Sequence, residues 1–487
     1  MRWLLSFSLL FFIQPIQAQT AIQSLDVESI KQRSVAVKNS AAAICDLRTI
    51  RCGSWTDLPI SSIHPTIDSL LTPTIKEELL KQINARHTQL GKDTLLTADL
   101  FYVLRPYIDW LHEVDPHCRI GARIPIDARV YKTKREFMKT RRALGFNLLC
   151  VQDSLVVNTS VNRLFRKGDM IVSINGIKPS ELIEYNYYDR YTTPAVLLQN
   201  YYFQHLPEVY TVQLVRGGEL LTITTEGMRH QKAASLLDIE ESMDKNIRIY
   251  ESSQTGYIAL PKFSYFYNPR IIKVLQSHIA KFKAKNCKNV ILDLRYNSGG
   301  SGYMFDKLLS LFINRPTIPY LKSQKLRVSP YTIEDYEFIT EEMIGQTITL
   351  PDSCTIKTID LDPELYIGDD IHVYILMSRN TSSIAASFCN IMQYNGSATL
   401  VGEPLCHNAL RYGETVTGEI WLSSLLYEAS IATTEYDEYS LAVDGVLMPD
   451  IPIPYIAKDY LSGQDAMLDK LLEIIKHYSQ QRNGDWN

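Results

Sequence analysis

The sequence predicts an α/β fold, and three observations support this prediction. After residue 245, short runs rich in β-branched residues alternate with segments of helical period. Between residues 140 and 230, short apolar segments are separated by glycine-containing turns, as in a small β domain. Residues 19–135 mix helical periodicity with polar breaks. Because 487 residues are too many for one small core, we expect these regions to form separate domains.

The first 18 residues have the pattern of a secretory signal peptide. Arg2 supplies the positive end, Leu4 to Ile13 form a short apolar run, and Ile16-Gln17-Ala18 precedes Gln19. The run is too short to span a bilayer, so we expect cleavage after about Ala18. No later segment has the apolar length of a membrane helix. We therefore expect an exported protein without stable membrane insertion.

Composition excludes several classes of function. A hydrophobic content of 45% and a charged content of 21% are typical of a folded globular protein. A formal net charge of −4 and the lack of Lys/Arg blocks argue against nucleic acid as a partner. Export permits disulfides among the eight cysteines, and Cys45 and Cys52 are the closest pair in sequence. Without CxxC, HExxH or His/Cys ligand spacing, we expect no metal site and no cofactor.

The N-terminal region from 19 to 135 contains two amphipathic segments, 75–90 and 96–111, which predict helices. The pattern changes at Asp115-Pro116-His117, and the apolar alternation from Cys118 to Ile124 predicts a strand.

The region 140–230 resembles a PDZ domain. Leu144-Gly145-Phe146 precedes a strand-like segment, and Gly168-Asp169 then begins a turn–strand–turn pattern that ends in Asn175-Gly176. The resemblance implies that the loop at Leu144, Gly145 and Phe146 presents backbone amides to a peptide carboxylate, beside an open strand edge.

The core is expected over residues 245–478. Its predicted strands are 256–260, 289–294, 371–377 and 398–401, and its predicted helices are 269–285 and 383–393. The second strand ends in Asp293-Leu294-Arg295 and then breaks into Asn297-Ser298-Gly299-Gly300. Glycines in this position free backbone N–H groups to face a ligand.

Ser383 is the candidate nucleophile. It follows the strand 371–377 and lies where the next helix begins, so the helix dipole and unpaired N–H groups favour developing negative charge there. A serine nucleophile needs such donors for the oxyanion of its tetrahedral intermediate. A serine before a helix is often an N-cap, but Ser382 is available for that role.

Together these motifs resemble the tail-specific, or C-terminal-processing, serine protease family, which includes the tricorn protease core and the retinoid-binding repeats. The resemblance covers most of the mature chain and is carried by 293–300, 380–386, 401–403 and 448–451. It implies a ClpP/crotonase-like core with a PDZ-like domain and an N-terminal helical region. Ser383 would be the nucleophile, and the amides of Ile384 and of one residue in the Gly299-Gly300 turn would form the oxyanion hole.

The resemblance leaves the general base open. Many members use a lysine about 25 residues after the serine, but Asn408 stands in that region and no lysine lies between Lys357 and Lys458. The branch similar to the tricorn core uses a histidine in an Asp-x-His segment, which His117 fits, and imidazole titrates near neutrality. His407, 24 residues after Ser383, is the alternative base.

A third group would orient the imidazole. The resemblance implies a carboxylate before the final Pro-Asp motif, for which Asp444 is the nearest acid and Glu438 a second candidate. We expect Asp293 and Arg295 to form a structural ion pair beneath the active loop.

The functional prediction is an exported serine peptidase, periplasmic or extracellular in a bacterium, that hydrolyses peptide bonds of protein or peptide substrates. The alternative is a catalytically inactive peptide- or lipid-binding protein on the same fold. The missing lysine and the sequence Pro404-Leu405-Cys406-His407, where the family often has Thr-Gly-Gly, favour this alternative.

Overall fold

A computed structural model gives the fold of the chain. It describes residues 49–51, 94–96, 119–122, 141–151, 154–184, 191–201, 206–263, 270–300, 305–329, 332–419 and 427–484, with single positions 81, 85, 117, 139 and 302. The predicted signal peptide and the Cys45–Cys52 pair lie outside these residues. Most residues of the two predicted N-terminal helices, 75–90 and 96–111, also lie outside the described residues. Leu96, where the second was expected to begin, instead ends strand β2 (Thr94–Leu96), which pairs with β1 (Thr49–Arg51).

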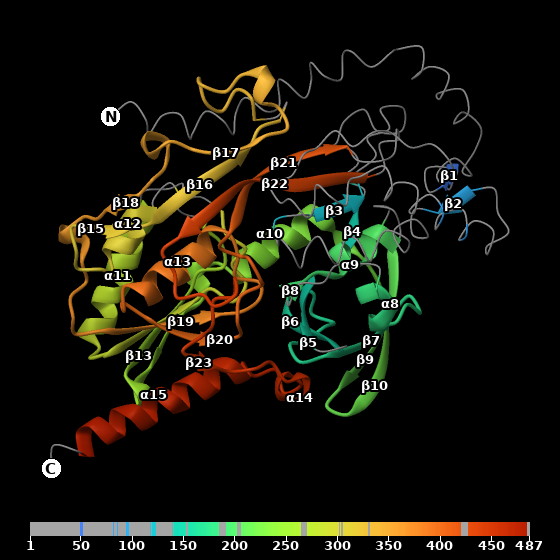
Figure 1. Cartoon of the computed structure of the whole chain (residues 1–487). Helices are drawn as coiled ribbons and strands as arrows, with labels where there is room; N and C mark the ends of the chain where they lie inside the picture. Colours follow the sequence, from blue (N-terminus) through green and yellow to red (C-terminus); the bar gives the residue numbers. More distant parts are fainter. Residues whose placement is uncertain are drawn as a thin grey trace.

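A mixed six-stranded sheet forms the centre of the core, which confirms the α/β class (Figure 1). Five of its strands are parallel, and β12 at one edge is antiparallel. In spatial order the strands are β12 (Ile247–Tyr250), β13 (Thr255–Ala259), β14 (Asn289–Asp293), β19 (His372–Met377), β20 (Thr399–Gly402) and β23 (Ile451–Pro452). The predicted strands are therefore present, with ends shifted by at most one residue.

Helices cover both faces of this sheet because its strands alternate apolar side chains between two clusters. On one face, residues such as Ile258 and Leu292 pack against three helices, α11 (Arg270–Ala284), α12 (Phe305–Ser310) and α13 (Ile384–Tyr394). On the other, Tyr257 and Ile291 pack against the C-terminal helix α15 (Ala466–Gly484), which Figure 1 shows in red beneath the sheet. The predicted helices 269–285 and 383–393 correspond to α11 and α13.

A separate six-stranded sheet lies in the region where the sequence predicted a small β domain. Its strands, in spatial order, are β10 (Glu219–Glu226), β9 (Val209–Arg216), β7 (Met170–Ile174), β6 (Ser154–Ser160), β5 (Phe146–Val151) and β8 (Tyr191–Thr192). Helices α8 (Pro179–Glu184) and α9 (Pro194–Tyr201) accompany it. The predicted Asn175-Gly176 reversal is present, with φ of 53° and 80° and a bridge between Ile174 and Ile177. We call this sheet with its two helices the small β domain.

The small β domain packs directly against the core. Leu149 and Val151 on β5 and Val156 on β6 belong to the same buried cluster as the core residues that face α15. On β5, Asn147 Nδ2 donates to Glu241 Oε1 at 2.5 Å, and Glu241 is the C-cap of α10 (His230–Glu240), the helix that precedes β12 in the chain.

The predicted peptide-binding loop is tightly packed. The side chains of Leu144 and Phe146 are buried, each 1% exposed, and Gly145 adopts φ +74°. Strand β5 pairs with β6 on one side and, at Leu148 and Leu149, with β8 on the other. The expectation of an open strand edge is therefore wrong at these two positions, because the chain supplies its own strand there.

A third sheet joins the N-terminal region to the core. Its strands are β17 (Thr347–Thr349), β16 (Leu321–Arg327), β22 (Tyr427–Glu438) and β21 (Tyr412–Glu419), and β3 (Arg119–Ala122) pairs with β22. The strand predicted after His117 is thus present as β3. Among the described residues no helix is long and apolar enough to cross a bilayer.

Candidate active site

Two neighbouring parallel strands deliver the predicted site residues to one edge of the core sheet. Strand β14 runs alongside β19, with Asp293 opposite Leu376, so both strands end at the same level. The loop 294–300 follows β14, and the loop 378–383 follows β19 and leads into α13. We call these segments the glycine loop and the serine loop.

Hydrogen bonds tie the two loops together. The donors come from the serine loop and the acceptors are carbonyl oxygens of the glycine loop, so neither segment can shift alone. Three bonds do this: Ser378 Oγ to Arg295 O (2.5 Å), Thr381 Oγ1 to Leu294 O (2.8 Å) and Ser382 N to Asn297 O (3.1 Å).

Ser383 occupies the N-cap position of α13 in a strained backbone conformation. Its φ of 56° and ψ of −136° are rare for a residue with a side chain, and its hydroxyl forms no capping hydrogen bond. The residue is half-buried and lies directly against Gly299, where an added Cβ would be 2.6 Å from Ser383 Cβ and 3.2 Å from Ser383 Oγ. The hydroxyl is therefore held beside the glycine loop and is not used to cap its helix.

The backbone N–H groups of Gly299 and Gly300, the two candidate oxyanion donors, differ in their hydrogen bonding. The Gly299 N–H donates to Asn297 Oδ1 at 2.9 Å, so it already has an acceptor. Among the described residues, the N–H groups of Gly300 and Ile384 have no hydrogen-bond partner. The sequence left open which glycine would serve as an oxyanion donor, and the hydrogen bonding favours Gly300.

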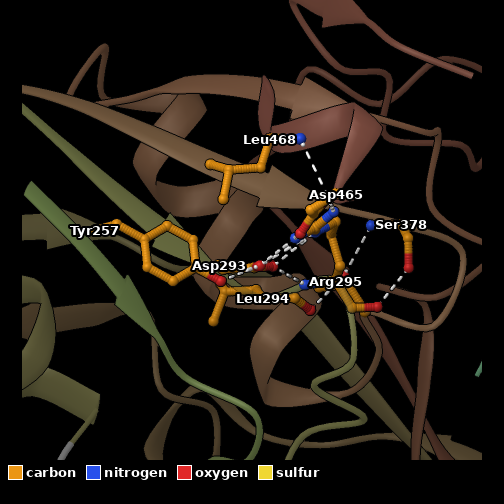
Figure 2. A network of polar contacts seen from close by, with 8 residues as sticks. Tyr257, Asp293, Leu294, Arg295, Ser378, Asp465 and Leu468 are labelled. Carbon is orange, nitrogen blue, oxygen red and sulfur yellow. Dashed lines mark hydrogen bonds and ion pairs between the residues drawn. The ribbon is translucent and has the colours of Figure 1, made fainter. Parts of the chain in front are cut away.

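An ion-pair network lies beneath the glycine loop (Figure 2). Arg295 is 1% exposed and donates to both Asp293 and Asp465, at 2.5 Å and 2.7 Å for its Nη2. Tyr257 Oη donates to Asp293 Oδ2 at 2.7 Å. The predicted Asp293–Arg295 ion pair is thus confirmed, and Asp465 joins it from the C-terminal part of the chain. Burial would raise the pKa of the Asp465 carboxyl, but the Arg295 guanidinium outweighs it and holds that pKa at about 2.

Glu438 is held inside the protein against α13. Its carboxylate accepts hydrogen bonds from Ser387 Oγ at 2.6 Å and from Asn390 Nδ2 at 2.8 Å. Ser387 and Asn390 lie four and seven residues after Ser383, on one face of its helix. Burial raises the pKa of the Glu438 carboxyl to about 7, and the two hydrogen bonds only partly oppose this. Glu438 therefore connects strand β22 to the helix that begins at the nucleophile.

This raised pKa gives a testable pH dependence. Because burial disfavours ionised Glu438, its contribution to stability is complete below pH 4.5 and is lost as the pH rises through about 7, at a cost on the order of 3 kcal/mol. Glu438→Gln should remove this loss, so urea unfolding at pH 5 and pH 8 should give a smaller difference for the variant than for wild type. Asp437→Asn, which alters the exposed neighbour, should keep the wild-type difference. Equal pH differences in wild type and Glu438→Gln would contradict the assignment.

The other predicted residues occupy two places. His117 lies half-buried in a turn two residues before β3. His407 and Asp444 are both exposed, and they sit on facing turns, because an added Cβ on Gly445 would be 3.3 Å from His407 Nε2. Asp444 thus lies beside the alternative base His407.

Asn408, in the region where many relatives carry lysine, is a buried structural residue. It is 5% exposed, adopts φ 57°, and its N–H donates to Gly445 O at 2.8 Å.

Two contributors to the site were missed by sequence reasoning. Asn297 lies within the quoted motif, where its amide could have been considered as a loop brace. Asp465 is 170 residues from Arg295, and no local pattern links them.

The sequence of the core matches a known protein family. The model of peptidase family S41 matches residues 254–413, which include both loops. The core is thus similar to peptidase family S41 over these residues. The S41 core is thus a serine-type peptidase core, as the resemblance to tail-specific proteases indicated. A comparison with curated protein sequences finds no match.

Two solved structures share the fold over most of the chain. The crystal structure of mature CPAF has a TM-score of 0.54 and 15% sequence identity, and covers 87% of this chain and 97% of its own. Mature CPAF complexed with lactacystin also has a TM-score of 0.54, at 14% identity, and covers 86% of this chain and 98% of its own. At this identity the similarity concerns the fold, which extends beyond the S41 core to the preceding regions.

Proposed function

We propose that this protein is an exported serine peptidase in which Ser383 attacks the peptide carbonyl and His117 is the general base. The observation that carries the proposal is Ser383 itself, held in a strained N-cap conformation against Gly299 and unused as a cap. Strain of this kind persists where the surroundings hold a side chain in a functional position.

The reaction follows from the groups around the hydroxyl. As Ser383 Oγ bonds to the carbonyl carbon, its proton passes to the imidazole of His117, and the carbonyl oxygen becomes an oxyanion. The N–H groups of Ile384 and Gly300 are the donors for that oxyanion, helped by the positive end of the α13 dipole. The imidazolium then protonates the leaving amine, and water hydrolyses the acyl-enzyme by the same steps in reverse.

The carboxylate that orients the imidazole is proposed from the two sequence candidates. Asp444 is exposed and lies beside His407, whereas Glu438 is buried on β22, the strand that pairs with β3 just after His117. Strand β3 pairs with β22 only at Tyr427–Ser430, and the Glu438 carboxylate is already bonded to Ser387 and Asn390, so we keep both Asp444 and Glu438 as candidates. The small β domain is proposed to receive the substrate's peptide tail.

A serine-directed fluorophosphonate probe tests the proposal. Wild-type mature protein should be labelled at Ser383, whereas Ser383→Ala should not be labelled and Ser382→Ala should be labelled as wild type. His117→Ala should slow labelling by about 10²-fold or more, and His407→Ala should leave it nearly unchanged. The reverse order of the two histidine variants would make His407 the base. No labelling of wild type, together with binding of peptide or lipid, would favour the inactive binding protein.

We also propose that the protein is exported. This proposal rests on the signal-peptide pattern of Arg2, the apolar run from Leu4 to Ile13, and Ala18. N-terminal sequencing of secreted or periplasmic protein should begin after about Ala18. An intact N-terminus on cytoplasmic protein would refute it.

A further inference from the structure

Asp465 lies outside the S41 match, at the start of the C-terminal helix, and reaches back to the glycine loop. Its two carboxylate oxygens each accept a hydrogen bond of 2.7 Å from Arg295, from Nη1 and from Nη2. This is a two-pronged pairing of a planar guanidinium with a carboxylate, which fixes orientation as well as charge. Asp465 Oδ1 also accepts the N–H of Leu468, so the carboxylate is anchored in the first turn of α15.

Among the described residues, Asp465 is the only hydrogen-bond acceptor for Arg295 Nη1. Asp293 receives hydrogen bonds from Arg295 Nε and Nη2, whereas Nη1 donates to Asp465 alone. The Arg295 backbone carbonyl in turn accepts the hydroxyl of Ser378 in the serine loop. Figure 2 shows this chain of contacts from α15 through the guanidinium to Ser378. Holding the guanidinium therefore holds one of the three residues of the glycine loop that are bonded to the serine loop.

The turn that carries Asp465 is seated on the small β domain. It follows α14 (Ala457–Tyr460), and it packs against the turn between β6 and β7. An added Cβ on Gly168 would be 2.7 Å from both Gly463 N and Leu461 O, and one on Gly463 would be 2.9 Å from Lys167 O. The two turns are thus in backbone contact with no room for a side chain.

We propose that Asp465 is a positioning residue for the oxyanion-binding loops, and that the small β domain influences the active site through the turn 461–465. The catalytic part of this inference rests on the proposed function. The coupling between the turn 461–465 and the glycine and serine loops can be measured whether or not the protein turns over substrate.

The first test is Asp465→Asn, which keeps the shape and removes the charge. Amide hydrogen exchange should quicken severalfold in peptides covering 294–300 and 378–384, and kcat on a peptide substrate should fall on the order of tenfold with KM nearly unchanged. Asp465→Glu should restore part of the loss. Asp469→Asn, an exposed carboxylate one turn further along α15, should resemble wild type in both measurements.

The exchange measurement separates the two hypotheses. Quickened loop exchange in Asp465→Asn, together with a wild type that does not react with fluorophosphonate, would support the coupling and refute the proposed function. A variant with a lower Tm but wild-type loop exchange and wild-type kcat, measured well below that Tm, would show that Asp465 is merely structural and would overturn the proposal.

The second test addresses the small β domain with two glycines of similar backbone conformation. Gly168 has φ +91° and abuts the turn 461–465, whereas Gly218 has φ +88° in the β9–β10 hairpin with nothing within 4 Å of an added Cβ. Gly168→Ala should quicken exchange in both active-site loops, and Gly218→Ala should not. The same exchange pattern for both variants would remove the small β domain from the inference.

Discussion

Gly299→Ala should lower kcat on the order of 10²-fold or more, because the new methyl group cannot fit against the nucleophile. The added Cβ would lie 2.6 Å from Ser383 Cβ, closer than such atoms approach one another, and 3.0 Å from Ser382 O, which is tighter than an ordinary contact. The φ of +100° adds backbone strain for any residue with a side chain. Ser383 or the glycine loop must therefore move, which separates the hydroxyl from the oxyanion donors.

Gly302→Ala provides the matched control in the same loop region. Its added Cβ would be 3.8 Å from Ile384 Cδ1, an ordinary contact, and the residue is exposed. Steady-state kinetics and fluorophosphonate labelling of both variants should show a loss for Gly299→Ala alone. Near-wild-type kcat in Gly299→Ala would mean that Ser383 is not the reacting group or is not held against this glycine during turnover.

Arg295→Met should destabilise the fold by about 3–5 kcal/mol at pH 7, because it leaves one buried carboxylate and one partly buried carboxylate without their cation. Asp293 and Asp465 both depend on this guanidinium, and their side chains are 4% and 21% exposed. Since Arg295 holds the pKa of Asp465 at about 2, the stabilisation from that carboxylate is present above its unfolded value of 3.8 and is lost as the pH falls through 2. The variant should therefore show a smaller loss of stability than wild type between pH 5 and pH 2.

Urea unfolding followed by circular dichroism measures this effect. Arg411→Met is a suitable control, because Arg411 pairs with Glu435 at 2.9 Å but is half exposed, and such pairs contribute less than about 1 kcal/mol. A cost for Arg295→Met as small as that of Arg411→Met would show that the buried network does not stabilise the fold.

Much of the core could be predicted from the sequence, since its strands and helices have strong local patterns. The run of β-branched residues at 289–293 and the apolar run at 371–377 became neighbouring parallel strands, β14 and β19. The glycine pair marked the loop after the first, and Ser383 marked the helix start after the second. These features depend on residues a few positions apart, which is the range over which periodicity and turn residues carry information.

In the small β domain, some contacts could not be predicted from such local patterns. Its strands and its Asn-Gly turn were predictable, but the pairing of β8 with β5 was not, because a two-residue strand has no periodicity to recognise. Nor could the sequence show that the turn at Gly168 meets the backbone at Gly463, almost 300 residues away.

Local sequence alone specified the strand ends, the glycine corner and a serine at the beginning of a helix, because each follows from the conformational preferences of adjacent residues. Three-dimensional packing chose among the candidates for the remaining roles. It gave the Gly299 amide to Asn297, placed Glu438 under α13, and brought Asp465 to Arg295. Burial and ion pairing act between groups that are close in space and distant in the chain, so their effects emerge only when the whole fold is assembled.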